Sequence, residues 1–255
     1  ADDVRRVVPR INWQTGTVYD MYRNNYHGKN SYTSENLTPQ SQSTTLYGST
    51  FYVVTSEFRV YLCINNGANP DNPDGQKSTT EPTHINTAPQ PSGGTDGYIW
   101  KYLYTISPSD IVKFVTTKYI PLPQKWGDAT NENIKNAAVD GEIQTIILKR
   151  EGAGVGVGTT NSGTITGIRI SGDGTGGEAT AVITNGKVTS VVPSAGGTGY
   201  TYGSLKFTTG DYVSGSGQPV TLGVPLSPQD VPDFEVVIPP KGGHGADIYR
   251  ELGGF

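Results

Sequence analysis

The chain has 255 residues, a formal charge of −4, 34 glycines and 17 prolines, and this length suffices for one large or two smaller domains with hydrophobic cores. The net negative charge argues against general electrostatic binding to nucleic acid or to an anionic membrane. No run approaches the roughly 18 to 20 apolar residues of a membrane helix, so we expect a soluble protein. The single Cys63 excludes an internal disulfide and indicates a reducing place of synthesis.

Composition indicates a mainly β fold. Only 34% of the residues are hydrophobic and 16% are charged, while there are 15 tyrosines. Tyr, Thr, Val and Ile favour strands, and few windows show apolar residues at helical spacing. The many glycines and prolines predict short elements joined by many turns.

The first segment, Val4–Trp13, mixes apolar and basic residues. Its arginines, Arg5, Arg6 and Arg10, could bind a carboxylate or a phosphate. A solvated or partner-facing cluster is the favoured interpretation.

Two strands are predicted next, from Ser49 to Thr55 and from Phe58 to Ile64. Only two residues separate them, so a hairpin is the simplest arrangement, with Cys63 as a small buried hydrophobe. Residues 65–94 then form a loop rich in Asn, Pro, Asp, Ser and Thr. Loops of this length are usually functional or lie against a neighbour, so we expect this one to contact another subunit.

A glycine and aspartate turn at Gly93–Gly97 leads into a strand crowded with aromatic rings. Side chains in a strand repeat every two residues, so the rings are predicted to share one face: Tyr98, Trp100, Tyr102 and Tyr104. The other face is predicted to hold Ile99, Lys101 and Leu103. Both faces therefore need a cover, from a second sheet or from a partner molecule.

Four further elements follow in order. Ser107–Asp110 predicts a capped helical turn, and Tyr119–Pro123 predicts an edge or covering segment because its prolines cannot donate hydrogen bonds. Asn131–Ala138 is a weak helix candidate. Gly141–Arg150 contains a predicted buried strand.

Composition changes near residue 151, after which Gly, Thr, Ser and Val dominate to about residue 212. Turn signals every eight to twelve residues predict a small all-β unit. Its clearest hairpin joins Glu178–Thr184 to Lys187–Val192 through Asn185-Gly186, the pair that a type I′ turn favours. Tyr200 is predicted to cap the small core.

Near the C-terminus, Phe234–Ile238 predicts a strand, and His244 follows among glycines. His27, His84 and His244 are scattered singly, without neighbours at metal-ligand spacing. The favoured interpretation of His244 is therefore a turn residue with a local hydrogen-bond partner, and no metal site is predicted.

The sequence contains no nucleophile elbow, zinc-binding helix motif or CxxC pair. A glycosidase pair of carboxylates depends on the fold, and its candidates are Glu57, Glu81, Asp96 and Glu142. None stands in a context that favours the role. No catalytic residue and no cofactor are predicted.

Four segments in order resemble the baseplate wedge subunit encoded by gene 8 in T4-like contractile-tailed phages: Val8–Trp13, Val60–Cys63, Asp96–Tyr104 and Lys118–Pro123. The most specific is the Asp-Gly-Tyr-hydrophobic-Trp core, and the resemblance covers roughly residues 4 to 128. Gly242–Gly253 is similar to a sequence segment in the longer, marine-phage members of this family.

This resemblance implies a multilayer β-sandwich with a few short helices, in a homodimer that joins other wedge subunits in the virion tail baseplate. It implies assembly in the host cytoplasm, with no catalysis, cofactor, nucleic acid or membrane partner. The candidate interface or core residues are Arg10, Trp13, Tyr98, Trp100, Tyr102, Tyr104 and Tyr119.

The Gly/Thr-rich unit has no counterpart in the T4 member and is similar to small β modules of phage tail proteins. We therefore predict an inserted domain at residues 151–224 within a main domain formed by residues 1–150 and 225–255. The chain is expected to be a fragment or only partly ordered.

Two functions remain open. The first is a structural subunit of a tail baseplate that passes rearrangement through rigid β domains. The second is a carbohydrate-binding module or tail-associated glycan hydrolase, in which exposed aromatic rings stack on sugars. The direction in which the rings of the aromatic strand point discriminates between them.

Overall fold

The computed structural model describes residues 4–25, 45–207, 220–222 and 231–254. Strands make up 36% and helices 9% of the chain, in several antiparallel sheets with three short α-helices among the described residues. The predicted mainly β fold is confirmed. No helix in the described ranges is long and apolar enough to cross a membrane.

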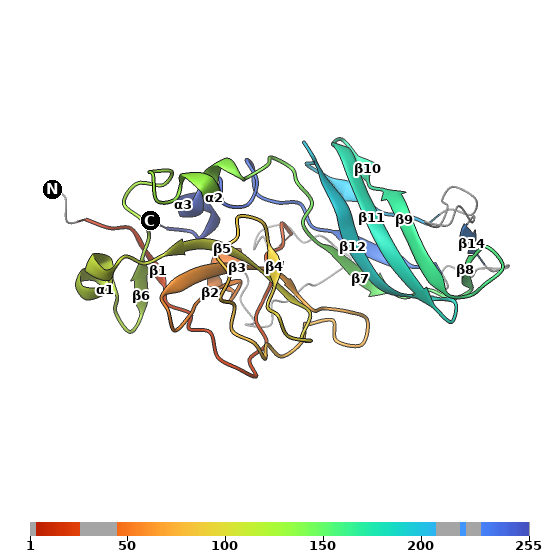
Figure 1. Cartoon of the computed structure of the whole chain (residues 1–255), viewed down its shortest axis with the longest axis horizontal. Helices are drawn as coiled ribbons and strands as arrows, with labels where there is room; N and C mark the ends of the chain where they lie inside the picture. Colours follow the sequence, from red (N-terminus) through yellow and green to blue (C-terminus); the bar gives the residue numbers. More distant parts are fainter. Residues whose placement is uncertain (1–3, 26–44, 208–219, 223–230, 255) are drawn as a thin grey trace. The chain divides into compact units, whose positions relative to one another are not determined.

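The chain divides into two compact units (Figure 1). Unit one comprises Ala1–Gly67, Asp74–Val139 and Gly242–Phe255, and unit two comprises Ala68–Pro73 and Asp140–Lys241. The strands predicted near residues 143–148 and 234–238 fall in unit two. The prediction of an inserted domain at 151–224 stays a prediction, and its end near residue 224 lies outside the described residues.

A four-stranded antiparallel sheet forms the centre of unit one. In spatial order it contains β2 (Tyr52–Val54), β3 (Arg59–Asn66), β5 (Tyr98–Thr105) and β4 (Gln90–Pro91). Tyr52 lies opposite Leu62, so the predicted hairpin between β2 and β3 is confirmed. All three residues of β2 and most of β3 are buried, because the sheet is covered on both faces.

The other elements of unit one are short (Figure 1). They are β1 (Val7–Pro9), the 3₁₀ turn η1 (Leu46–Gly48), α1 (Pro108–Phe114), β6 (Tyr119–Pro121), α2 (Glu132–Asn136) and α3 (Ile248–Glu251). Among the described strands, β6 pairs only with β1, as expected for a segment whose prolines cannot donate hydrogen bonds. The predicted helical turn is confirmed, since the Ser107 side chain accepts a hydrogen bond from the Asp110 backbone N–H, and α2 confirms the weak helix candidate.

A bulge in the pairing of β3 with β5 changes the predicted faces of the aromatic strand. Tyr61 lies opposite Tyr102, whereas the adjacent Val60 lies opposite Tyr104, so one extra residue of β5 is accommodated between them. Opposed residues share a face, and neighbours along a strand do not. The prediction of one aromatic face is therefore wrong for Tyr104, which lies on the face that holds Lys101.

In its described residues, unit two contains four small antiparallel sheets. They are β12 (Lys187–Thr198), β11 (Thr175–Thr184) and β9 (Gly163–Arg169); β7 (Ile146–Arg150) and β15 (Asp233–Val236); β8 (Val155–Val157) and β14 (Val220–Leu222); and β10 (Ser171–Gly172) and β13 (Gly203–Ser204). The Asn185-Gly186 hairpin is confirmed, with φ of 52° and 79°. Both values are positive, as a type I′ turn requires.

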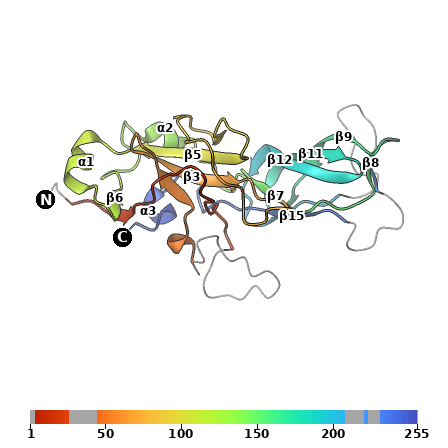
Figure 2. The same cartoon turned by 90° about the horizontal axis from the view of Figure 1, so that it is seen from below.

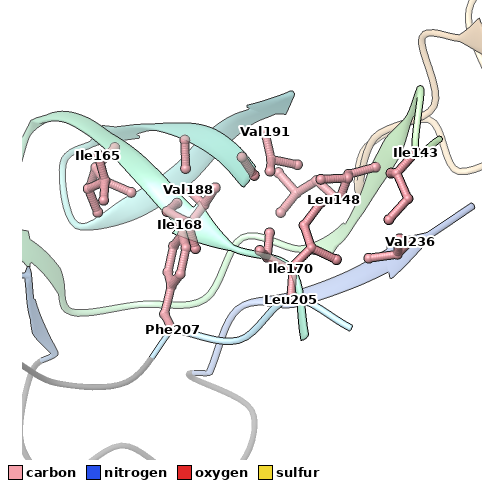
Figure 3. Close-up of a cluster of buried hydrophobic side chains, with 14 of the residues drawn as sticks. Ile143, Leu148, Ile165, Ile168, Ile170, Val188, Val191, Leu205, Phe207 and Val236 are labelled. Atoms are coloured by element: carbon pink, nitrogen blue, oxygen red, sulfur yellow. The ribbon is translucent and has the colours of Figure 1, made fainter. Parts of the chain in front are cut away.

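Aliphatic side chains from these sheets meet in one core (Figure 3). Ile165, Ile168 and Val188 are completely buried there, with Tyr200 at 3% exposure. The Tyr200 hydroxyl donates to the Ile170 carbonyl (3.0 Å) and accepts from the Gly177 N–H (3.2 Å). The predicted capping role of Tyr200 is thereby confirmed, and a Cβ at Gly174 would collide with its ring.

Candidate functional site

Three aromatic rings form a buried cluster in unit one. Tyr98 and Trp100 stack with ring centroids 5.3 Å apart, and Tyr19 meets both edge-on at 6.4 and 5.9 Å. Each ring is at most 2% exposed. Offset-stacked and edge-to-face pairs are the favoured aromatic geometries, so the cluster is a packed core.

Hydrogen bonds fix the cluster to the backbone around it. The Tyr98 hydroxyl accepts from the Tyr19 backbone N–H (2.8 Å) and donates to the Gln76 carbonyl (2.9 Å). Burial raises the pKa of Tyr98 well above its ordinary value, so the hydroxyl stays protonated and can donate. Trp100 Nε1 is buried without a hydrogen-bond partner in the described part of the chain.

Asp96 joins the long loop to the start of the aromatic strand. Its carboxylate accepts hydrogen bonds from the Thr79 backbone N–H (2.7 Å), the Ser92 hydroxyl (2.9 Å) and the Tyr98 backbone N–H (3.1 Å). Desolvation raises the pKa of Asp96, but these hydrogen bonds together outweigh it and the pKa lies below its usual value. The carboxylate is therefore a structural acceptor.

The long loop packs on the sheet of its own unit over much of its length. Tyr61 donates to the His84 carbonyl (2.7 Å), and the buried Lys101 donates to the Thr87 carbonyl (2.8 Å). His84 Nε2 lies 3.1 Å from the Trp100 carbonyl, and burial lowers the pKa of His84. Contact of this loop with another subunit stays a prediction.

The remaining aromatic candidates of β5 differ in burial. Tyr104 is 1% exposed and donates to the Pro121 carbonyl (3.0 Å), which ties β5 to β6. Tyr102 is half-buried, meets the ring of Tyr61 at 5.7 Å, and its hydroxyl lies 2.8 Å from that of Thr105. The side chain of Tyr102 therefore lies at the margin of the core.

The candidates outside β5 lie at or near the surface of unit one. Trp13 is half-buried, and its indole N–H donates to the Ser78 hydroxyl (3.0 Å). Arg10 is half-buried and donates to the Thr116 carbonyl (3.1 Å). Tyr119 is 47% exposed. Contact of Arg10, Trp13 and Tyr119 with a partner stays a prediction.

The candidate carboxylates all have structural partners. Glu57 forms an ion pair with Arg59 (2.6 Å), Glu81 accepts from the Ser56 N–H (2.7 Å), and Glu142 accepts from the Gln144 side-chain amide (2.7 Å). Asp96 accepts the hydrogen bonds from Thr79, Ser92 and Tyr98 described above. The ion pair of Glu57 and the hydrogen bonds of the other three give these carboxylates local roles in turns and loops.

A buried pair near the C-terminus could not be predicted from the sequence. His244 Nδ1 lies 2.5 Å from Glu251 Oε1, and each residue is 4% exposed. The second oxygen of Glu251 accepts from the Gly245 N–H (2.8 Å), and Tyr22 meets the His244 ring edge-on. His244 thus has a local partner, as its sequence context predicted; Glu251 gave no signal because its spacing matches no motif.

His27 lies outside the described residues. Within the described ranges, no group of three or more His, Cys, Asp or Glu side chains could hold a metal ion.

These contacts define a structural β framework whose central aromatic rings are enclosed by their own chain. Residues 40–151 match the model of the family described as "Phage-Gp8: Bacteriophage T4, Gp8". The match includes the four-stranded sheet, the aromatic strand and the long loop, and it supports a structural role in a phage tail baseplate. No curated protein and no solved structure matches the chain.

Proposed function

We propose that this protein is a structural subunit of a phage tail baseplate wedge, which links neighbouring wedge proteins and passes on baseplate rearrangement during tail contraction. The observation that carries the proposal is the Gp8 family match over residues 40–151, which includes the buried aromatic strand. The proposal includes a homodimer in the virion, assembled in the host cytoplasm, without catalytic activity.

The internal ties of unit one suit a rigid element in such an assembly. Asp96 holds the long loop to the sheet, Tyr104 holds β6 to β5, and Trp126 donates to the Gly245 carbonyl (2.8 Å). Packed elements with many such ties move as a body when an interface shifts. Unit one would therefore transmit displacement between neighbours without refolding.

Burial of the aromatic rings disfavours the carbohydrate alternative. A sugar platform needs an exposed ring face, whereas Tyr98, Trp100 and Tyr104 are at most 1% exposed. A glycan array that shows saturable binding by the intact chain, lost in a folded Trp100→Ala variant, would restore that alternative.

The second part of the proposal concerns unit two. The chain is proposed to be a marine-phage-type member of the Gp8 family, in which the Gly/Thr-rich module is an insertion. A hydrophobic core of its own supports a separately folded module, and because that core also contains Ile143, Leu148 and Val236, the proposed module extends beyond residues 151–224 on both sides. Limited proteolysis of the whole protein should release this unit intact by cleavage near its ends. Rapid digestion of both units together would contradict a separate folding unit.

The main test is location in the particle. Cryo-electron microscopy of virions carrying the protein should show density for unit one within the baseplate wedge. The chain in the capsid or tail tube, or absent from purified virions, would refute the proposal.

A further inference from the structure

Two segments of unit one form a continuous surface that the proposed function leaves without a role. They are residues 4–10, which contain β1, and residues 107–122, which contain α1 and β6; we call them together the α1 surface. Strand β6 pairs with β1, and Arg5 of the first segment is ion-paired with Asp110 of α1 (3.1 Å). The two views agree that α1 lies beside β6 (Figures 1 and 2).

Helix α1 has little support from its own chain. It has seven residues and none of them is buried. Helices this short are unstable in water, and in proteins they are held mainly by burial of an apolar face. Here the cap from Ser107, the Arg5–Asp110 ion pair and the contact of the Arg5 guanidinium with the Phe114 ring (5.1 Å) hold the helix in place.

Three apolar side chains of the α1 surface are exposed to solvent. Val112 is 86% exposed, Val4 72% and Tyr119 47%. Val112 is the most exposed of the large hydrophobic residues described. Scattered exposed apolar residues are normal, but these three belong to two paired segments that include an unburied helix, and this combination favours a contact site.

The α1 surface carries a net positive charge, although the chain as a whole is acidic. Its two segments contain five bases, namely Arg5, Arg6, Arg10, Lys113 and Lys118, against a single carboxylate, Asp110. The whole chain has a formal charge of −4. A local positive field on an acidic protein attracts and orients negatively charged partners.

We propose that the α1 surface binds an acidic segment of a neighbouring protein subunit, whose apolar side chains cover Val112 and Tyr119. Carboxylates of that segment pair with Lys113 and Lys118 at the rim, where charges set specificity and association rate. Covering the apolar residues supplies the burial that α1 lacks. This inference deepens the proposed function and rests on it for the choice of a protein partner.

Nucleic acid is a poorer occupant. Phosphate recognition uses basic and hydrogen-bonding groups, and it leaves exposed aliphatic side chains such as Val112 without a role.

Zero-length carbodiimide cross-linking of purified virions tests the inference, because this reagent joins lysines only to carboxylates that touch them. Peptide mass spectrometry should recover Lys113 and Lys118 linked to Asp or Glu of a different polypeptide. Lys125, an exposed lysine of the same unit outside the α1 surface, is the matched control and should give far fewer such links.

A Val112→Asp variant gives a second readout, since it places a carboxylate against the acidic partner. In competition with the wild type for incorporation into particles, it should be disfavoured about tenfold or more. Thr130→Asp, at an exposed residue of unit one outside both the α1 surface and the long loop, should compete equally. Both variants should unfold like the wild type, because the replaced side chains are exposed.

The outcomes separate this inference from the proposed function. Virions that lack the protein overturn the baseplate role. Virions that contain it, but in which Lys113 and Lys118 link to no other polypeptide and Val112→Asp competes equally, overturn the inference alone. Binding of the purified chain to phosphatidylcholine vesicles containing phosphatidylglycerol, lost in Val112→Asp, would overturn it in favour of a membrane surface.

Discussion

Replacing Trp100 with alanine should strongly destabilise unit one. The side chain is completely buried, stacks on Tyr98 and meets Tyr19 edge-on. Removal of a buried tryptophan costs about 3–5 kcal/mol, which includes the cavity that remains. Loss of the stacked and edge-on ring contacts adds roughly 0.5–1.5 kcal/mol to this destabilisation. The substitution removes no hydrogen bond from Nε1 to a described residue. We therefore expect a loss of about 5 kcal/mol.

Urea unfolding followed by circular dichroism measures this loss. The transition of unit one should move to lower urea, while that of unit two stays in place, if the units unfold separately. Tyr119→Ala is the matched control, because this aromatic residue of the same unit is 47% exposed and should change stability by less than about 0.5 kcal/mol. A loss below about 1 kcal/mol for Trp100→Ala would refute the buried cluster.

Three other changes have expected outcomes. Gly186→Ala should destabilise unit two by roughly 1–2 kcal/mol in urea unfolding, because φ is 79° there; an unchanged midpoint would contradict the type I′ turn. Tyr200→Phe should cost unit two about 1–3 kcal/mol, since the Ile170 carbonyl and Gly177 N–H lose their buried partner, and amide hydrogen exchange at Gly177 should accelerate. Hydrogen bonds from Thr201 and Tyr202 lower the pKa of Asp173 to about 2. The stabilising effect of a depressed carboxyl pKa is complete above about pH 4 and lost as pH falls towards 2, so an NMR titration should find this midpoint, and Thr201→Val should raise it.

Local patterns predicted the elements whose causes are local. The Asn185-Gly186 turn, the Ser107 cap and the β2–β3 hairpin each depend on a few adjacent residues, and each is present. The face of Tyr104 could not be predicted, because the bulge arises from pairing with β3 and not from the sequence of β5. One extra residue in a strand moves every later side chain to the opposite face of the sheet.

The candidate site depended still more on distant contacts. The aromatic excess of β5 identified a surface that needed a cover, but not its source. The structure shows that the long loop and Tyr19 supply much of that cover. The pairing of His244 with Glu251 was beyond prediction because it needs the turn at Gly245 and the helix α3 together.

The core of unit one extends beyond the residues that the family model matches. Tyr19 and Tyr22 precede residues 40–151, and Ile248 and Leu252 follow them, yet each of these four side chains is at most 6% exposed. Trp126 inside the matched range donates its indole N–H to Gly245 outside it. Since a buried aromatic ring cannot lose its cover without a large cost in stability, the flanking segments belong to the same folding unit as the matched sheet. The matched residues alone are therefore only part of a domain, and the structural role inferred from them extends to both segments that complete their core.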